Sequence, residues 1–171
     1  AYWLAPPVAL WRAIELRARD ALDCDRPLLD LGCGDGLIGA VLFGQQEAAD
    51  VGIDPWADQL HRAADLGVYG HLDQGLGDAP PYGSGHFSTV LSNSVLEHIR
   101  DVEPVLHEVA RVLRPGGRFI FTVPSDVFRQ MLDGYVRRVK ADDLQAAEAY
   151  ARRIDQRLEH HHYYTPAEWK R

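Results

Sequence analysis

The stretch that most constrains the fold of this chain is residues 28–39, which read LLDLGCGDGLIG. A short apolar run enters a loop rich in glycine, and a helical pattern follows at once. Glycines in such a loop let the backbone turn sharply and approach a ligand closely. A strand, a glycine loop and a helix in this order are typical of the start of a parallel α/β sheet that binds a nucleotide-like ligand.

Apolar runs and helical patterns alternate along the chain. The runs at residues 28–31, 51–53, 87–91 and 118–123 predict strands, and the segments between them predict helices at residues 37–43, 56–64 and 102–113. Residues 114–117, RPGG, are expected to stop the last of these helices with a turn before the next strand. The alternation predicts a doubly wound, mostly parallel sheet with helices on both faces.

Helical patterns also flank this core. Residues 1–24 are expected to hold a leading helix, and residues 126–159 predict two helices broken near residues 141–142. An insertion at the carboxyl edge of a sheet commonly covers a substrate site, so we expect residues 126–159 to form a lid. Residues 165–168, TPAE, have the spacing of capping residue, proline and glutamate that starts a helix.

The composition bounds the class of protein. A chain of 171 residues, 46% of them hydrophobic, suits a single domain over residues 1–171. The net charge is −7, with 17 acidic against 9 basic side chains in residues 1–125, which makes nucleic-acid binding an unfavoured function. No apolar run approaches the roughly 20 residues of a membrane-spanning helix, and Cys24 and Cys33 match no zinc or disulfide spacing. We therefore expect a cytoplasmic protein with no membrane partner.

Two kinds of ligand are compatible with the glycine loop. The GxGxxG fingerprint of dinucleotide-binding sites is satisfied by Gly34, Gly36 and Gly39. Asp54 lies 20 residues beyond Gly34, where a ribose-binding acid belongs, so a nicotinamide-dependent oxidoreductase is one hypothesis. However, Asp30 and Asp35 would place two carboxylates beside a pyrophosphate. S-adenosylmethionine has no phosphate and brings an ammonium and a sulfonium cation, so the charges favour it.

Five segments carry a family resemblance. They are residues 30–36 (DLGCGDG), 51–55 (VGIDP), 77–79 (GDA), 91–99 (LSNSVLEHI) and 112–119 (VLRPGGRF). In this order they resemble the motifs of class I S-adenosylmethionine-dependent methyltransferases, over residues 28–124. The resemblance implies strand order 3-2-1-4-5 followed by two more strands, so we expect residues to be missing beyond Arg171. One departure is Ser88, where the family commonly has aspartate after phenylalanine.

The resemblance also implies which residues bind the cofactor. Gly32 and Gly34 would line its methionine portion, Asp54 would bind both ribose hydroxyls, and Asp30 would orient the amino group. Asp78 with Ala79 would meet the adenine, and Asn93 with Ser94 would lie near the sulfonium, although Asp78 could instead simply shape a turn. Cys33 is expected to be a small loop residue and not a nucleophile. The full set comprises Asp30, Gly32, Cys33, Gly34, Gly36, Asp54, Pro55, Asp78, Ala79, Asn93 and Ser94.

Glu97 and His98 follow the fourth predicted strand at its carboxyl end and are candidate catalytic residues for substrate binding or proton removal. With residues 160–162, HHH, they resemble in part the metal-binding pattern of methyltransferases of the ubiquinone-biosynthesis and small-RNA-terminus types. That pattern is Glu-x-x-Glu-His with a later histidine, and Ser94 stands at its first glutamate. A histidine run is also an ordinary polar joint, so we expect no metal.

Together these features predict an enzyme that transfers a methyl group from S-adenosylmethionine to an oxygen, nitrogen or carbon atom of a small molecule. Transfer from a sulfonium is an in-line displacement with an activated donor, so the protein mainly supplies alignment and exclusion of water. The alternative is a non-catalytic S-adenosylmethionine-binding regulatory module. The sequence leaves room for a homodimer.

Overall fold

The structure, a computed structural model, describes residues 17, 24–43 and 49–170. These residues belong to two compact units. The sheet unit comprises residues up to Asn93 together with Glu103–Thr122, and the helical unit comprises Ser94–Val102 and the chain from Val123 onward. The leading helix expected within residues 1–24 falls on residues that lie outside the described part, apart from Arg17 and Cys24.

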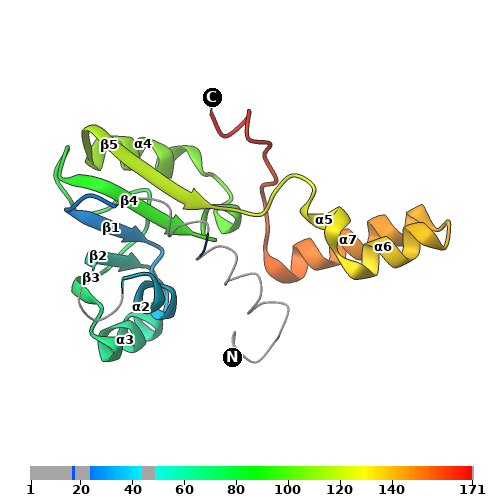
Figure 1. The fold of residues 1–171 in the computed structure, drawn as a ribbon, viewed down its shortest axis with the longest axis horizontal. Helices are drawn as coiled ribbons and strands as arrows, with labels where there is room; N and C mark the ends of the chain where they lie inside the picture. Colours follow the sequence, from blue (N-terminus) through cyan, green and yellow to red (C-terminus); the bar gives the residue numbers. More distant parts are fainter. Residues whose placement is uncertain (1–16, 18–23, 44–48, 171) are drawn as a thin grey trace. The chain divides into compact units, whose positions relative to one another are not determined.

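The sheet unit is built on five strands that all pair in parallel (Figure 1). Their order is β3-β2-β1-β4-β5, which confirms the predicted doubly wound topology. The strands are β1 (Leu28–Leu31), β2 (Ala49–Asp54), β3 (Tyr69–Gln74), β4 (Phe87–Asn93) and β5 (Leu113–Thr122).

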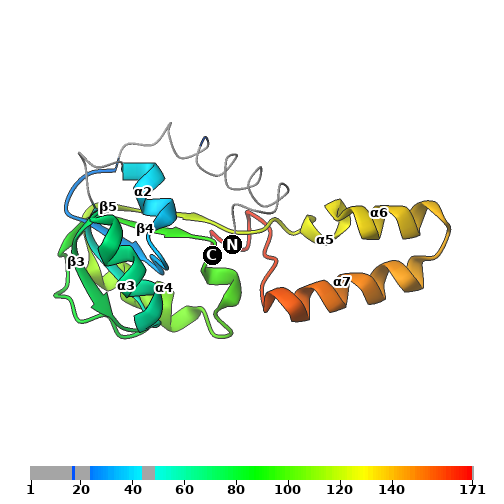
Figure 2. The ribbon, with the colours of Figure 1, turned by 90° about the horizontal axis from the view of Figure 1, so that it is seen from below.

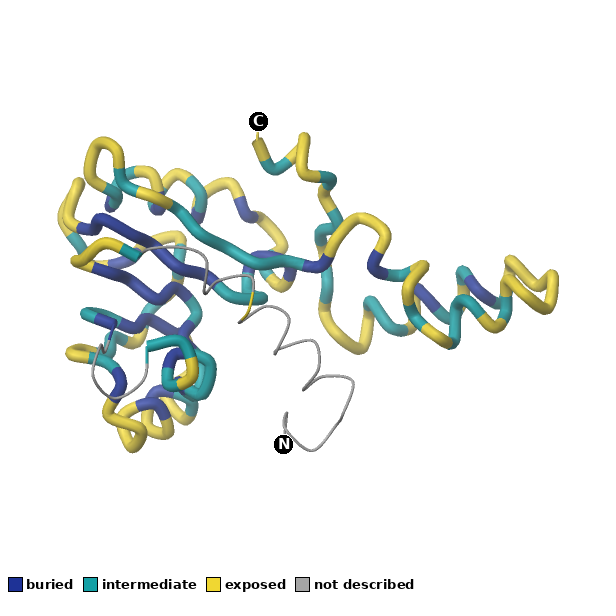
Figure 3. The backbone as a smooth tube through the Cα atoms, viewed as in Figure 1, coloured by how far each residue is buried: buried dark blue, intermediate teal, exposed yellow. Residues whose placement is uncertain are grey.

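The core of the sheet unit lies along its two central strands, β1 and β4. All of β1 is buried, and β4 is buried from Phe87 to Ser92 (Figure 3). Both strands have a hydrogen-bonded neighbour on each side, so they are buried along their length, and β4 buries the small polar side chains of Ser88, Thr89 and Ser92 as well as its apolar ones.

Three helices cover the sheet: α2 (Leu37–Phe43), α3 (Ala57–Leu66) and α4 (Glu103–Val112). Right-handed crossovers place α2 and α3 on one face and α4 on the other. In agreement, a side chain at Gly77 would meet both Leu31 of β1 and Val105 of α4, whereas one at Gly36 would meet Ala63 of α3. The glycine loop therefore lies at the carboxyl end of β1, where open α/β sheets bind ligands.

Two features of the sheet differ from the sequence-based prediction. The apolar runs did not locate β3, because this edge strand, YGHLDQ, is only partly buried and carries polar residues. The turn predicted at residues 114–117 is instead part of an irregular start of β5. Phe87 pairs with Leu113 and Thr89 with Arg118, so these residues form a bulge inside the ladder.

Ser88, the departure from the family pattern, forms local hydrogen bonds at the start of β4. Its Oγ donates to the carbonyl of Arg26 at 2.5 Å, and its backbone N–H donates to the carbonyl of Pro27 at 2.8 Å. The side chain is therefore satisfied without the usual aspartate.

The helical unit contains a 3-10 turn, η2 (Leu96–His98), and three helices (Figure 2). They are α5 (Phe128–Met131), α6 (Asp133–Lys140) and α7 (Leu144–Leu158). The predicted break near residues 141–142 is confirmed: Asp142 has a φ of 59°, and the side chain of Asp143 caps α7 by accepting from Ala146 N. A second break at Leu132, whose ψ of 128° is extended, makes the expected two helices into three.

Helices α6 and α7 pack side by side as an antiparallel pair (Figure 2). Ala147 and Ala151 of α7 are fully buried, and the Tyr135 hydroxyl donates to Glu148 Oε1 at 2.8 Å. The capping residues Thr165 and Glu168 bond to each other as predicted, but residues 166–170 form turns and not a helix. Within the described part of the chain, no helix is long and apolar enough to cross a membrane.

Candidate functional site

The glycine loop follows β1 and is held against β2 by backbone hydrogen bonds. The N–H groups of Gly32 and Cys33 both donate to the carbonyl of Ile53, at 2.8 and 3.1 Å. Gly34 and Gly36 have φ values of 54° and 76°, a region in which side chains are strained. The loop therefore needs glycine to turn back over the sheet edge.

Asp54, at the end of β2, lies against this loop as expected. Its Oδ2 accepts from Gly34 N at 2.9 Å, and its Oδ1 accepts from Trp56 N at 2.9 Å. The residue is only 6% exposed. Because each carboxylate oxygen can accept two hydrogen bonds, both oxygens keep capacity for the hydroxyls of a ribose while they fix the loop.

Asp30, at the third position of β1, is buried beneath the loop. Its Oδ2 accepts a hydrogen bond of 2.6 Å from the hydroxyl of Tyr69, the first residue of β3. Burial raises the pKa of Asp30 to about 6; the hydrogen bond from Tyr69 opposes this rise, and the nearby carboxylate of Asp54 adds to it. Asp30 thus bonds to a residue of β3, which lies beyond β2 in the sheet, and not to solvent.

Tyr69 is a residue that the sequence-based analysis missed. Its hydroxyl lies so close to α2 that a Cβ at Gly39 would overlap it. Burial, together with the charge of Asp30, raises the pKa of Tyr69, so the phenol stays protonated and can act as the donor. The glycine at position 39 therefore makes room for Tyr69 instead of completing a pyrophosphate-binding fingerprint. A tyrosine at the start of a polar edge strand has no sequence signal that would have revealed this role.

Asp35 occupies the N-terminus of α2. Its Oδ1 accepts a hydrogen bond of 3.2 Å from Leu37 N. In dinucleotide-binding folds the pyrophosphate sits at this helix end, because the unpaired backbone N–H groups and the helix dipole attract an anion. A carboxylate already placed there repels a phosphate and suits a cationic ligand.

Cys33 is 7% exposed, and burial together with the charge of Asp30 raises the pKa of its thiol. A buried neutral thiol is a poor nucleophile. Its expected role as a small loop residue agrees with this environment.

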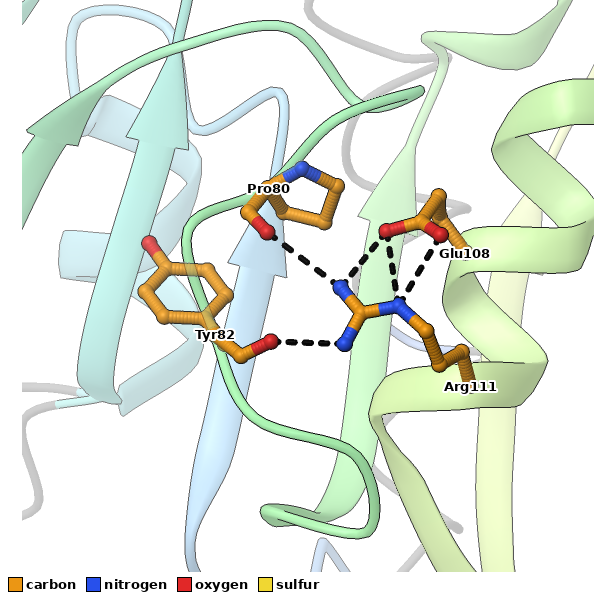
Figure 4. A network of polar contacts seen from close by, with 4 residues as sticks. All are labelled: Pro80, Tyr82, Glu108 and Arg111. Atoms are coloured by element: carbon orange, nitrogen blue, oxygen red, sulfur yellow. Dashed lines mark hydrogen bonds and ion pairs between the residues drawn. The ribbon is translucent and has the colours of Figure 1, made fainter.

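Asp78 and Ala79 lie on an exposed turn in which Ala79 N donates to the carbonyl of Leu76. Residues 80–82, which follow, are held to α4 by Arg111 (Figure 4). The Arg111 guanidinium donates to the carbonyls of Pro80 and Tyr82, at 3.3 and 2.7 Å, and pairs with Glu108 at 2.6 Å. Asp78 thus has the environment of a turn residue, next to an anchored segment.

Asn93 ends β4, and its Oδ1 accepts from Thr122 Oγ1 of β5 at 3.0 Å. Ser94 follows with a φ of 54° and belongs to the helical unit. Pro55 is exposed directly after Asp54, and its carbonyl accepts from Gln74. In the sheet unit the structure therefore brings the loop, Asp30 and Asp54 together.

The two catalytic candidates lie on η2, in the helical unit. Glu97 is 1% exposed, whereas the side chain of His98 is 44% exposed with its Nε2 4.0 Å from Glu97 Oε1. His160 packs against His98, with ring centroids 5.0 Å apart. Burial, and then the neighbouring His98, lowers the pKa of His160 to about 4, which makes this imidazole neutral at physiological pH. The two candidates thus lie on a short 3-10 turn that buries the carboxylate of Glu97 and leaves His98 exposed.

Comparison with known proteins gives consistent matches. Residues 29–121 match a family model described as a methyltransferase domain. An uncharacterized methyltransferase of Mycobacterium sp. (strain KMS) is 32% identical over 108 residues, which cover 63% of this chain and 41% of that protein. The 27-O-demethylrifamycin SV methyltransferase of Amycolatopsis mediterranei (strain S699) is 31% identical over 151 residues, covering 78% of this chain and 53% of that protein.

Among solved structures, a SAM-dependent methyltransferase from Thermotoga maritima matches with a TM-score of 0.62. It is 19% identical, and the match covers 82% of this chain and 69% of that one, which shows a shared fold. The chain spans only 41% and 53% of the length of the two curated relatives above.

Proposed function

The chain belongs to the class I S-adenosylmethionine-dependent methyltransferases, and we propose that it transfers the methyl group of S-adenosylmethionine to an oxygen, nitrogen or carbon atom of a small molecule. The family model covers residues 29–121, which contain the whole glycine loop and all five strands, entirely or nearly so. One relative is by its name a methyltransferase of a small molecule, 27-O-demethylrifamycin SV.

The observation that carries the proposal is the arrangement of carboxylates around the loop. Asp54 lies against Gly34, Asp30 is buried beneath the loop, and Asp35 caps the helix that follows. Asp54 suits the ribose of either cofactor, whereas Asp30 and Asp35 disfavour a pyrophosphate and favour the ammonium and sulfonium of S-adenosylmethionine. A nicotinamide cofactor does not suit this arrangement.

The residues of the sheet unit would act mainly by holding the donor. Asp54 binds the ribose hydroxyls, and the backbone of Gly32 and Gly34 lines the methionine portion. Because the sulfonium is already activated, in-line alignment and exclusion of water supply most of the acceleration. We further propose that residues 126–159 form the lid that excludes water, and that Glu97 or His98 removes a proton when the acceptor is a hydroxyl or amine.

The direct test is turnover. The protein is incubated with S-adenosylmethionine carrying a labelled methyl group and a panel of hydroxylated and aminated small molecules. Methyl transfer should release S-adenosylhomocysteine in step with labelled product. If the cofactor binds but no acceptor in a broad panel is methylated, the non-catalytic S-adenosylmethionine-binding module becomes the better account.

A further inference from the structure

Two segments that are distant in sequence meet inside the helical unit: the turn η2 and the residues that follow α7. The N–H of His161 donates to the carbonyl of Glu97 at 2.7 Å, and His162 Nε2 donates to the carbonyl of Ile99 at 2.7 Å. These bonds fix the two segments against each other and bring His160 beside η2. We propose that Glu97, His98 and His160 form a binding site for one divalent transition-metal ion.

The three side chains offer a suitable set of ligand atoms. One atom from each, a carboxylate oxygen and two imidazole nitrogens, lies within 4.8 Å of the other two. Metal–ligand bonds of about 2.1 Å in a tetrahedral site put neighbouring ligand atoms about 3.4 Å apart, so the cluster needs to contract by roughly an ångström. His98 is half exposed and can supply this movement by rotating its side chain.

The protonation of His160 is set by its neighbours. The Tyr163 hydroxyl donates to Asp155 Oδ1 at 2.6 Å, and the same hydroxyl oxygen lies 3.0 Å from His160 Nδ1. Since the Tyr163 proton is used by Asp155, the oxygen accepts from a protonated Nδ1, a tautomer assigned from this hydrogen-bond network. The lone pair of His160 then resides on Nε2. Metal-binding histidines are commonly oriented in this way, with the second nitrogen donating to a fixed acceptor.

The buried carboxylate points to the same conclusion. Glu97 has a side chain that is only 2% exposed, and burying an ionised carboxylate is costly unless positive charge compensates it. A divalent ion between Glu97 and the two imidazoles would add such compensation.

The ligand types indicate which ion fits. Imidazole suits zinc, iron, copper and nickel, whereas magnesium and calcium prefer oxygen ligands throughout. Two histidines and one carboxylate leave coordination positions open for water or for an oxygen atom of a bound molecule. Of the three proposed ligands, His160 also lines a cavity of about 310 Å³, together with Arg100, Asp155, Gln156, Glu159 and His161.

The sequence alone favoured no metal, because Ser94 stands where a second carboxylate would be needed and histidine runs are common. Sequence spacing cannot show that His160, and not His161 or His162, turns toward Glu97. The structure supplies that distinction: His161 is exposed, and His162 uses Nε2 for the carbonyl of Ile99.

The test is calorimetry of Zn²⁺ alone with the untagged full chain, after chelator treatment and dialysis. We expect one equivalent to bind, with Mg²⁺ giving no signal. His98→Gln and His160→Gln should each lower the affinity for Zn²⁺ at least about tenfold. Tyr163→Phe should lower the affinity less, because this substitution removes only the acceptor that orients His160. His161→Gln is the matched control, since it removes a neighbouring exposed imidazole and should leave the affinity unchanged.

The outcome that would overturn the proposal is an equal loss in His161→Gln and His160→Gln, which would mean that the histidine run binds Zn²⁺ as a surface tract. Unchanged affinity in His98→Gln would overturn it as well. Circular dichroism and thermal melting of each variant show whether it is folded, and the exposed His98 is the position least able to disturb the fold. Zn²⁺ binding needs no S-adenosylmethionine, so this result is independent of the proposed methyl transfer.

Discussion

The sheet unit and the helical unit both bury carboxylates, but they hold them differently. In the sheet unit, Asp30 and Asp54 accept hydrogen bonds from a phenol and from backbone N–H groups of adjacent strands and loops. In the helical unit, Glu97 lies beside two imidazoles, that of His98, the next residue, and that of His160, which follows α7 much later in the chain. Asp54 is held by backbone groups of the glycine loop and of Trp56, within a recognisable sequence pattern. The contacts of Asp30 with Tyr69 and of Glu97 with His160, by contrast, exist only once the chain has folded.

Among substitutions in the two units, we expect Asp30→Asn in the sheet unit to change the free energy of unfolding most. Its pKa is 3.8 ordinarily and about 6 when folded, so between these values the folded protein binds more protons than the unfolded chain. The free energy of unfolding therefore falls as the pH rises through this window. Above it, the ionised Asp30 lowers the free energy of unfolding by about 3 kcal/mol. Asparagine can still accept from Tyr69 without carrying the charge.

We accordingly expect urea unfolding at pH 8 to show a higher free energy of unfolding for Asp30→Asn than for the wild type, by up to about 3 kcal/mol. Near pH 4 the two proteins should differ little. A difference that is the same at both pH values would show that the buried charge has no such cost. If the variant also binds S-adenosylmethionine more weakly, the destabilising carboxylate of Asp30 is retained because it contributes to cofactor binding.

The next largest effect concerns Asp54→Ala. The substitution removes a charged acceptor for two ribose hydroxyls, so the binding free energy of S-adenosylmethionine, measured by calorimetry, should become about 2–3 kcal/mol less favourable. Asp58→Ala, on the exposed first turn of α3, is the matched control and should bind normally. Equal affinities of wild type and Asp54→Ala would break the assignment of the sheet unit as the cofactor-binding part.

A smaller effect is expected for Gly39→Ala, which tests how tightly the sheet unit is packed. The added Cβ would overlap the Tyr69 hydroxyl, and overpacking of this kind costs about 1–3 kcal/mol. Gly83→Ala, where a Cβ would meet nothing within 4 Å, should be nearly neutral in the same thermal melts. Adding Tyr69→Phe should restore part of the loss in Gly39→Ala. If the double variant shows no such recovery, the loss of stability in Gly39→Ala does not come from a clash with the Tyr69 hydroxyl.

The smallest effect is expected for the corresponding substitution in the helical unit, Gly134→Ala. Its Cβ would meet the ring of Tyr150, but this ring is only partly buried and can move. Alanine favours a helix over glycine by about 1 kcal/mol at both Gly39 and Gly134, so the expected difference rests on the ring of Tyr150 yielding more easily than Tyr69, which is bonded to Asp30. Thermal melting should therefore change little. A loss as large as that of Gly39→Ala would show that the two units are equally intolerant of added volume.

Much of the sheet unit could be predicted from the sequence. The strand–glycine loop–helix signal is local, so the positions of β1, α2 and Asp54 follow from spacing and periodicity. The edge strand β3 could not be located, because partial burial removes the apolar run that marks a strand. With β3 unseen, the contact of Tyr69 with Asp30 could not be anticipated either.

In the helical unit the sequence predicted helices and one break but little of the chemistry. The break at Leu132 has no glycine or proline to mark it, so periodicity alone joined α5 to α6. Glu97 reads as a surface residue until the fold buries it. The orientation of His160 depends on Tyr163 and Asp155, which no spacing rule connects.

If the acidic glycine loop selects a cationic cofactor, calorimetry of S-adenosylmethionine and of NAD with the same protein will separate the two ligands. We expect one equivalent of S-adenosylmethionine to bind through the sheet unit, with lower affinity in Asp54→Ala, and NAD to give no detectable heat. Binding of NAD at equal or higher affinity, or no binding of S-adenosylmethionine by a folded protein, would contradict this expectation.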